Sequence, residues 1–99
     1  ELYAGKAVEL SPDDAYCNVI YGQVLHHRNR LSEARPYFEK AVRLDSTYGE
    51  PKAELAAISH DQGDFEEAIE WGEQALGLSL DRRDKRFLRR LVRECKSSL

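Results

Sequence analysis

The residues with the clearest capacity for chemistry are three histidines, His26, His27 and His60, and two cysteines, Cys17 and Cys95. Imidazole and thiolate groups are the usual zinc ligands, and a zinc site needs three or four of them at fixed geometry. The histidines stand where turns are expected, and the cysteines form no CxxC pair. We therefore predict that the histidines line polar turn edges, with a zinc site or a pH-sensitive contact as the alternative.

The other residue types offer no catalytic pattern. Two isolated thiols are typical of a reducing compartment, so we expect a cytoplasmic location and no disulfide. No serine lies in a GxSxG context, and no glycine-rich loop could hold a phosphate. Every carboxylate fits a solvated helix face. The sequence thus predicts a protein that is not an enzyme and that uses no cofactor and no metal.

A basic cluster near the C-terminus is the strongest charge signal. Residues 82–99 carry a net charge of +6, and the rest of the chain carries −9. No aromatic residue is expected among the exposed positions of the cluster. We interpret it as the solvated face of a terminal helix; an acidic protein partner is the alternative, and nucleic acid or a membrane is less favoured. The candidate residues of this basic patch are Arg82, Arg83, Arg86, Arg89, Arg90 and Arg93.

The elements that must position these residues follow from an internal repeat. KAVEL at residues 6–10 returns as KAVRL at 40–44 and, in kind, as QALGL at 74–78, so the period is 34 residues. Self-similarity at a fixed period of this size indicates stacked repeats. Within each period, apolar and small residues recur at helical spacing in two stretches that a turn separates. The sequence therefore predicts two helices per repeat.

Helix ends are predicted from capping residues. Ser11 is expected to cap the first helix of one repeat, with Pro12 at its first position, and Ser32 is expected to cap the second helix. In the next repeat, Gly63 can adopt a left-handed conformation in the turn, and Asp64 can cap the following helix. Near the C-terminus, Phe87, Leu88, Leu91, Val92 and Cys95 recur at helical spacing, which predicts the apolar side of a capping helix.

The spacing of residue sizes resembles the tetratricopeptide repeat family. Tyr21-Gly22-x2-Leu25, Ala34-x3-Phe38 and Ala41 match the family pattern, and Leu55-Ala56, Ala68-x3-Gly72 and Ala75 repeat it. Gly72 departs from the pattern, which has an aromatic residue there. Its neighbour Trp71 is expected to cover apolar surface, with ligand stacking as the alternative.

The resemblance implies an all-α fold, an antiparallel helix-turn-helix repeat array of about two and a half repeats and a capping helix. We expect one domain over residues 1–99. Its parts are the second helix of a partial repeat at 1–11, a repeat at 12–46, a repeat at 47–80 and the capping helix at 83–96. Residue 1 is not methionine, so we expect a fragment of a longer chain.

In this family, the first helix of each repeat lines a concave groove that holds a peptide or a partner helix. The cations that some relatives use to bind a terminal carboxylate are absent here, so the groove suits a peptide with apolar anchors and positive charge. By the resemblance, the groove residues are Tyr16, Val19, Gln23, His26 and His27, and Glu50, Ala53, Glu54, Ala57 and Asp61.

We therefore predict a non-catalytic scaffold that binds a protein or peptide partner. One alternative is self-association through the unpaired first helix, which would leave Leu2, Tyr3 and Val8 partly uncovered. Another is a regulatory segment of a larger enzyme. No apolar run is long enough to cross a membrane.

Overall fold

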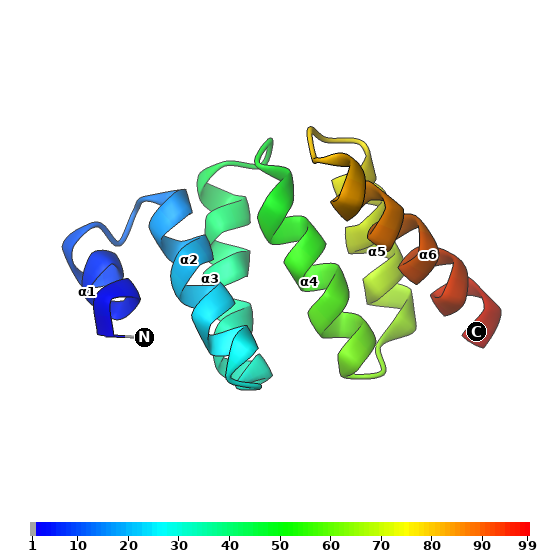
Figure 1. Ribbon diagram of the computed structural model, residues 1–99, viewed down its shortest axis with the longest axis horizontal. Helices are drawn as coiled ribbons and strands as arrows, with labels where there is room; N and C mark the ends of the chain where they lie inside the picture. The colour runs from blue at the N-terminus through cyan, green and yellow to red at the C-terminus, as the bar shows by residue number, and fades with distance from the viewer. Residues whose placement is uncertain (1) are drawn as a thin grey trace. The chain divides into compact units, whose positions relative to one another are not determined.

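The computed structural model describes the backbone of residues 2–99 and the side chains from Gly5 onward. The described residues form α-helices and no strand, as predicted. They divide into two compact units, Glu1–Ser46 and Thr47–Leu99. Each unit contains three of the described helices, which are labelled in Figure 1.

The first unit contains α1 (Leu2–Leu10), α2 (Ala15–His27) and α3 (Leu31–Leu44). Helices α2 and α3 pack closely along their length, and α1 packs on α2. The core of the pair is formed by fully buried apolar residues of α2 and α3, because their spacing of three and four places them on one helix face. These residues are Val19, Leu25, Ala34, Phe38 and Ala41.

Close approach of α2 and α3 depends on Gly22. A Cβ atom at this position would lie 2.8 Å from Cζ of Phe38, which is too close for any side chain without movement of the ring. Phe38 is completely buried. The ring therefore fills the space that glycine leaves open, as close packing of protein interiors requires.

The polar start of α2 differs from the prediction. The cap is Asp14, not Ser11, because the Asp14 carboxylate accepts a hydrogen bond from the backbone N–H of Cys17 at 3.1 Å. Pro12 lies in the preceding turn. The buried Asn18 amide donates to the carbonyl oxygens of Pro12 and Asp14, at 2.9 and 2.8 Å. These bonds fix the turn between α1 and α2.

The predicted Ser32 cap is also wrong. Helix α3 begins at Leu31, and its N-cap residue, Arg30, makes no side-chain capping bond. Instead Arg30 forms an ion pair with Glu33 at 2.6 Å. Asn29 has a φ of 60°, a left-handed conformation that asparagine tolerates better than most residues. The helix therefore begins two residues before the start that a Ser32 cap would require.

The second unit contains α4 (Gly49–Asp61), α5 (Phe65–Leu76) and α6 (Arg82–Ser98). Each of its helices contacts the other two. Gly63 has a φ of 80°, and the Asp64 carboxylate accepts from the backbone N–H of Glu67 at 3.2 Å. Both features confirm the predicted turn and cap. The buried cluster that joins the three helices is Ala56, Ala68, Ala75, Leu88, Leu91 and Cys95.

Gly72 of α5 lies against the third helix of this unit. A Cβ atom on Gly72 would lie 2.6 Å from Cγ2 of Val92 and 3.9 Å from Cβ of Ala56. The neighbouring Trp71 is half-buried and packs on the cluster, which confirms that it covers apolar surface. Its indole N–H donates to a carboxylate oxygen of Glu67 at 3.3 Å. Helix α6 thus supplies part of the core of the α4–α5 pair.

Candidate functional site

The predicted interaction residues of α2 have different degrees of exposure. Tyr16 is 63% exposed and His27 is exposed, whereas Gln23 and His26 are half-buried. Positions 16, 23 and 27 lie on one helix face, because residues seven and eleven apart return to the same side. Val19 is completely buried, so it is a core residue and offers no surface to a partner.

Sequence reasoning missed Ile20 on this face. Ile20 is half-buried and lies one turn after Tyr16, between Tyr16 and Gln23 on the same side of α2. Its i, i+4 spacing from Tyr16 was the signal that could have identified it. Together the two side chains give the α2 face an apolar section.

The predicted residues of α4 also share one helix face. Asp61 is exposed, and the others are half-buried. The Tyr48 hydroxyl donates to Glu50 at 3.0 Å, and Nδ1 of His60 lies 3.4 Å from Asp61. The face combines two small side chains with three carboxylates; its residues are Glu50, Ala53, Glu54, Ala57 and Asp61.

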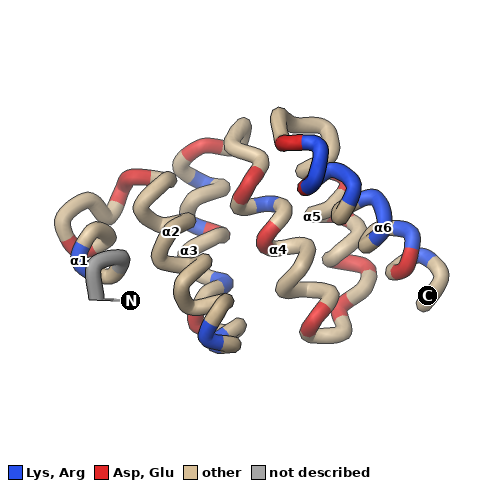
Figure 2. The backbone as a smooth tube through the Cα atoms, in the orientation of Figure 1, with Lys and Arg blue, Asp and Glu red and all other residues tan. Residues whose placement is uncertain are grey.

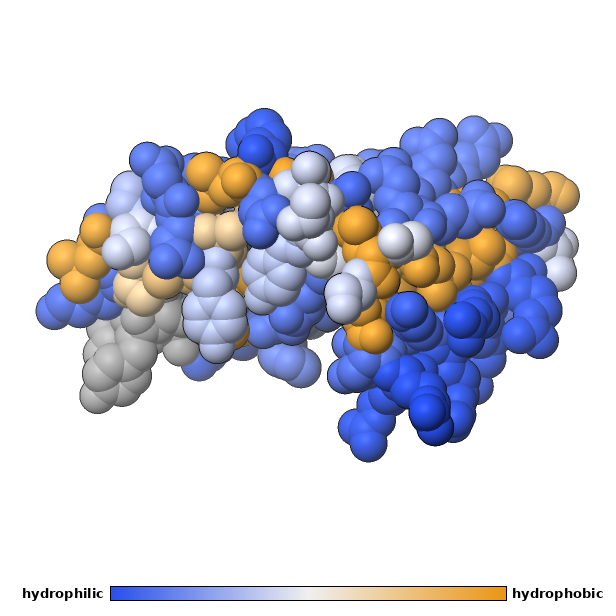
Figure 3. All heavy atoms as spheres, turned by 90° about the horizontal axis from the view of Figure 1, so that it is seen from above, coloured by the Kyte–Doolittle hydropathy of each residue, from blue (hydrophilic) through white to orange (hydrophobic). Residues whose placement is uncertain are grey.

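Helix α6 carries the basic patch. Figure 2 shows Lys and Arg along nearly the whole helix, and all six predicted arginines are exposed. The space-filling view in Figure 3 shows strongly hydrophilic side chains gathered where α5 and α6 lie, beside a band of hydrophobic atoms. The inner side of α6 is apolar and buried, so the helix has two chemically distinct sides.

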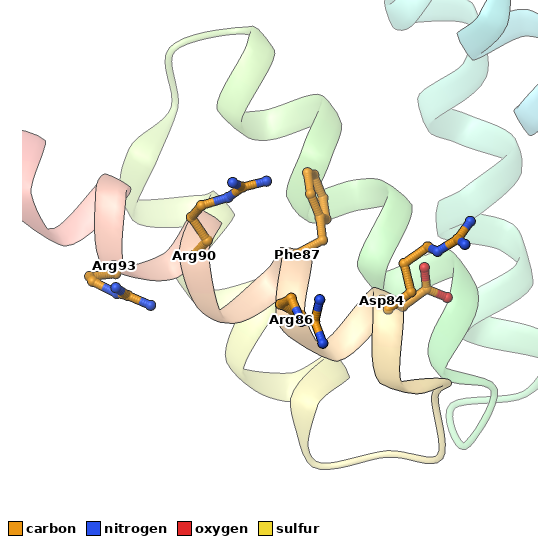
Figure 4. A pocket seen from close by; sticks show the side chains of 6 residues that line it. Asp84, Arg86, Phe87, Arg90 and Arg93 are labelled. Atoms are coloured by element: carbon orange, nitrogen blue, oxygen red, sulfur yellow. The ribbon is translucent and has the colours of Figure 1, made fainter.

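Part of the patch surrounds an open hollow of about 540 Å³, which we call the α6 hollow. Arg82 and Arg89 of the predicted patch are not among its lining residues. Figure 4 shows the Phe87 ring and the Arg90 side chain pointing to the same side of the helix. The residues that line the α6 hollow are Arg83, Asp84, Arg86, Phe87, Arg90 and Arg93.

Phe87 corrects the prediction that it belongs to the buried side of α6. It is 43% exposed and lies among the arginines. The buried side is complete without it, because Leu88, Leu91, Val92 and Cys95 already follow helical spacing. The signal in the sequence was that Phe87 directly precedes Leu88. Adjacent residues lie about 100° apart around a helix, so Phe87 falls at the edge of the face that Leu88 buries.

Two parts of the chain are similar to known protein families. Residues 1–48 match one family described as tetratricopeptide repeat, and residues 53–86 match a second family of the same description. The chain belongs to the tetratricopeptide repeat family.

The fold agrees with this membership. The crystal structure of YrrB, described as a TPR protein with an unusual peptide-binding site, superposes with a TM-score of 0.85 at 22% sequence identity. The similarity covers 96% of this chain and 47% of YrrB, so the chain spans about half the length of that protein. A search of curated proteins found no match.

Asp84 of this tetratricopeptide repeat chain is a carboxylate whose surroundings change its pKa. Burial raises its pKa above the ordinary value, and the nearby charges of Asp81 and Glu50 raise it further, while Arg83 partly opposes them. Asp84 lies in the first turn of α6, and Glu50 lies at the start of α4. The surroundings therefore destabilise the ionised form of Asp84 where α4 and α6 meet.

The two thiols are poorly suited to nucleophilic chemistry. Burial, followed by the charge of Glu94, raises the pKa of Cys95, and partial burial, followed by Asp14, raises that of Cys17. Both cysteines are free. Because the thiolate is the reactive form, both groups are weak nucleophiles at neutral pH.

The histidines lie at helix ends. The His26 and His27 rings are stacked with centroids 6.3 Å apart, and His60 packs on Phe65 at 5.9 Å. Among the described residues, no three His, Cys, Asp or Glu side chains group so that they could hold a metal ion. None of the helices described here is long and apolar enough to cross a membrane.

Proposed function

We propose that the chain is a non-catalytic protein-interaction scaffold that binds a peptide or a partner helix, with one contact surface on α2 of the first unit and one on α4 of the second. The observation that carries the proposal is Tyr16, an aromatic ring that is 63% exposed in the first turn of α2. Tyrosine is enriched at interfaces because it combines a large apolar area with a polar end. Ile20 extends this apolar area by one helical turn.

The α4 face favours a partner that approaches closely and carries positive charge. Ala53 and Ala57 leave room for a partner backbone or an apolar side chain, and Glu50, Glu54 and Asp61 surround them with negative charge. Opposite charges at the rim of such a surface give orientation and association rate. The preferred ligand is therefore a peptide with apolar anchors and basic residues.

The similarity to YrrB supports the class of function that we propose, which is binding of a peptide. YrrB is described as having a peptide-binding site, and this chain has the same fold. Tetratricopeptide repeats are generally interaction modules without catalytic activity. The identity of the partner follows from neither observation, so the proposal rests on the chemistry of the two helix faces.

The test is a screen of immobilised peptides that vary in aromatic and basic content. Tyr16→Ala and Glu54→Lys are each expected to weaken the best ligand by about tenfold, the effect of losing one well-packed interface contact. The matched controls are Leu44→Ala, an exposed apolar residue of α3, and Glu70→Lys, an exposed carboxylate of α5. Equal binding by all four variants would reject the α2 and α4 faces as the contact surfaces.

Self-association through α1 is the competing proposal. Val8 is half-buried, and the side chains of Leu2 and Tyr3 lie outside the described residues. Sedimentation of the chain at several concentrations separates the two proposals, because a monomer throughout removes self-association and leaves peptide binding unaffected.

A further inference from the structure

We propose that the α6 hollow docks a short acidic peptide segment that carries one apolar side chain. The residues that line it differ from those of the α2 and α4 faces, and its ligand has the opposite charge. The proposal rests on three features of the second unit: unpaired arginines, an exposed phenylalanine and the length of the surface.

Three of the four arginines of the hollow form no ion pair among the described residues. Within the described part of the chain, no carboxylate lies within ion-pair distance of Arg86, Arg90 or Arg93. By contrast, Lys96 on the same helix pairs with Glu73 at 3.6 Å. A guanidinium group binds a carboxylate through two parallel hydrogen bonds, which makes an arginine surface well suited to acidic side chains.

Phe87 gives the charged surface an apolar centre. Its ring is 43% exposed and lines the hollow with four arginines. An apolar group that covers an exposed ring removes apolar surface from water, which favours binding. An apolar side chain in the ligand would gain this contact while flanking carboxylates reach the guanidinium groups.

The length of the surface limits the size of the ligand. Ten residues separate Arg83 from Arg93, which is about 15 Å along a helix. An extended strand covers that distance with about four or five residues. Every second side chain of such a segment faces the surface, so a central apolar residue with acidic residues two positions away on either side fits the arrangement in Figure 4.

The surrounding charge favours a peptide over nucleic acid. Residues 47–81 carry nine acidic residues and one basic residue, and Asp84 lies in the hollow itself. A long polyanion would extend beyond the arginines over this acidic surface, where like charges repel it. One phenylalanine is also not the series of aromatic residues on which single-stranded nucleic acids stack.

The test measures fluorescence anisotropy of a labelled five-residue peptide, four glutamates around a central phenylalanine, at about 50 mM salt, where screening is weak. Saturable binding is expected with the wild-type chain. Arg86→Glu with Arg90→Glu should weaken it by about tenfold or more, since both guanidinium contacts become repulsive. Phe87→Ala should weaken binding of this peptide more than binding of an all-glutamate peptide.

The matched control is Arg82→Glu with Arg89→Glu, which changes the net charge equally on the same helix but outside the hollow. It should weaken binding by about threefold at most, through the long-range field alone. Circular dichroism verifies that both variants keep their helices. The proposal is overturned by equal losses in the two variants, by no saturable binding to the wild type, or by tighter binding of a twelve-residue oligothymidine.

Discussion

Each unit has a glycine at a contact between two helices, and a different side chain fills the space beside that glycine in each unit. In the first unit, Gly22 of α2 faces Phe38 of α3, and the ring occupies the space beside the glycine. One period later the sizes are changed, since Ala56 takes the place of Gly22 and Gly72 takes the place of Phe38. There the space beside Gly72 is occupied by Val92, which comes from α6.

The two repeats therefore keep the space between their paired helices filled, but not with the same residue. Protein interiors are packed to nearly constant density, so a missing aromatic ring must be replaced from another element. In the second unit that element is α6. The helix is therefore part of the core of its unit as well as its polar cover.

The units also differ in how their positive charges are used. In the first unit Arg30 pairs with Glu33, and Arg35 pairs with Glu39 at 3.4 Å. In the second unit Arg86, Arg90 and Arg93 of the α6 hollow have no such partners among the described residues. The buried side of α6 completes the core, which leaves its exposed side available for a ligand.

Phe38→Ala is expected to have the largest effect on this comparison. The ring is completely buried against a glycine, so its removal leaves a cavity, and the free energy of unfolding should fall by about 3–5 kcal/mol. Amide hydrogen exchange should show the loss of protection in α2 and α3. Trp71 is the only tryptophan, so its fluorescence reports the second unit independently.

The matched control for that variant is Phe87→Ala, which removes the same ring at a position that is 43% exposed. Its effect on stability should be below about 1 kcal/mol, as for most surface substitutions. A loss for Phe38→Ala no greater than that for Phe87→Ala would contradict the packing role of the ring.

Asp84→Asn is expected to have the smallest effect, and its sign depends on pH. The folded-state pKa of Asp84 lies above the unfolded value, so folding becomes less favourable as pH rises between the two values. At neutral pH the variant should therefore be slightly more stable than the wild type. The difference should disappear below about pH 3.9, the ordinary pKa of aspartate, because both states are then protonated.

Urea unfolding at a series of pH values measures this difference, with Glu94→Gln as the control for removal of one negative charge from the exposed side of α6. A variant that is less stable than the wild type at neutral pH would show that Asp84 contributes favourably as a carboxylate.

Much of the fold could be predicted from the sequence because the repeat fixes helix faces. The buried positions of Ala34, Phe38 and Ala68 follow directly from periodicity and residue size. The caps were harder, since several capping residues compete near each helix start. Asp14 rather than Ser11 caps α2, because the turn that Asn18 holds lies between them.

The interaction surfaces could be predicted less well, because exposure depends on the rotation of each helix. Val19 is buried although the half-buried Ile20 follows it, and Phe87 is exposed although the buried Leu88 follows it. A rotation of one residue, about 100°, decides between core and surface. Sequence periodicity locates a face to about that precision, so residues at its edge are the ones that it misplaces.

The most direct test of the account is a double-mutant cycle between Gly72 and Val92, measured as free energies of unfolding. Gly72→Ala should destabilise the wild type by about 1 kcal/mol or more, because its Cβ would lie 2.6 Å from Cγ2 of Val92. In a Val92→Ala background that methyl group is absent. There the same substitution should stabilise the chain by about 0.5–1 kcal/mol, the usual gain of alanine over glycine within a helix. An effect of the same sign and size in both backgrounds would contradict the claim that α6 fills the space beside Gly72.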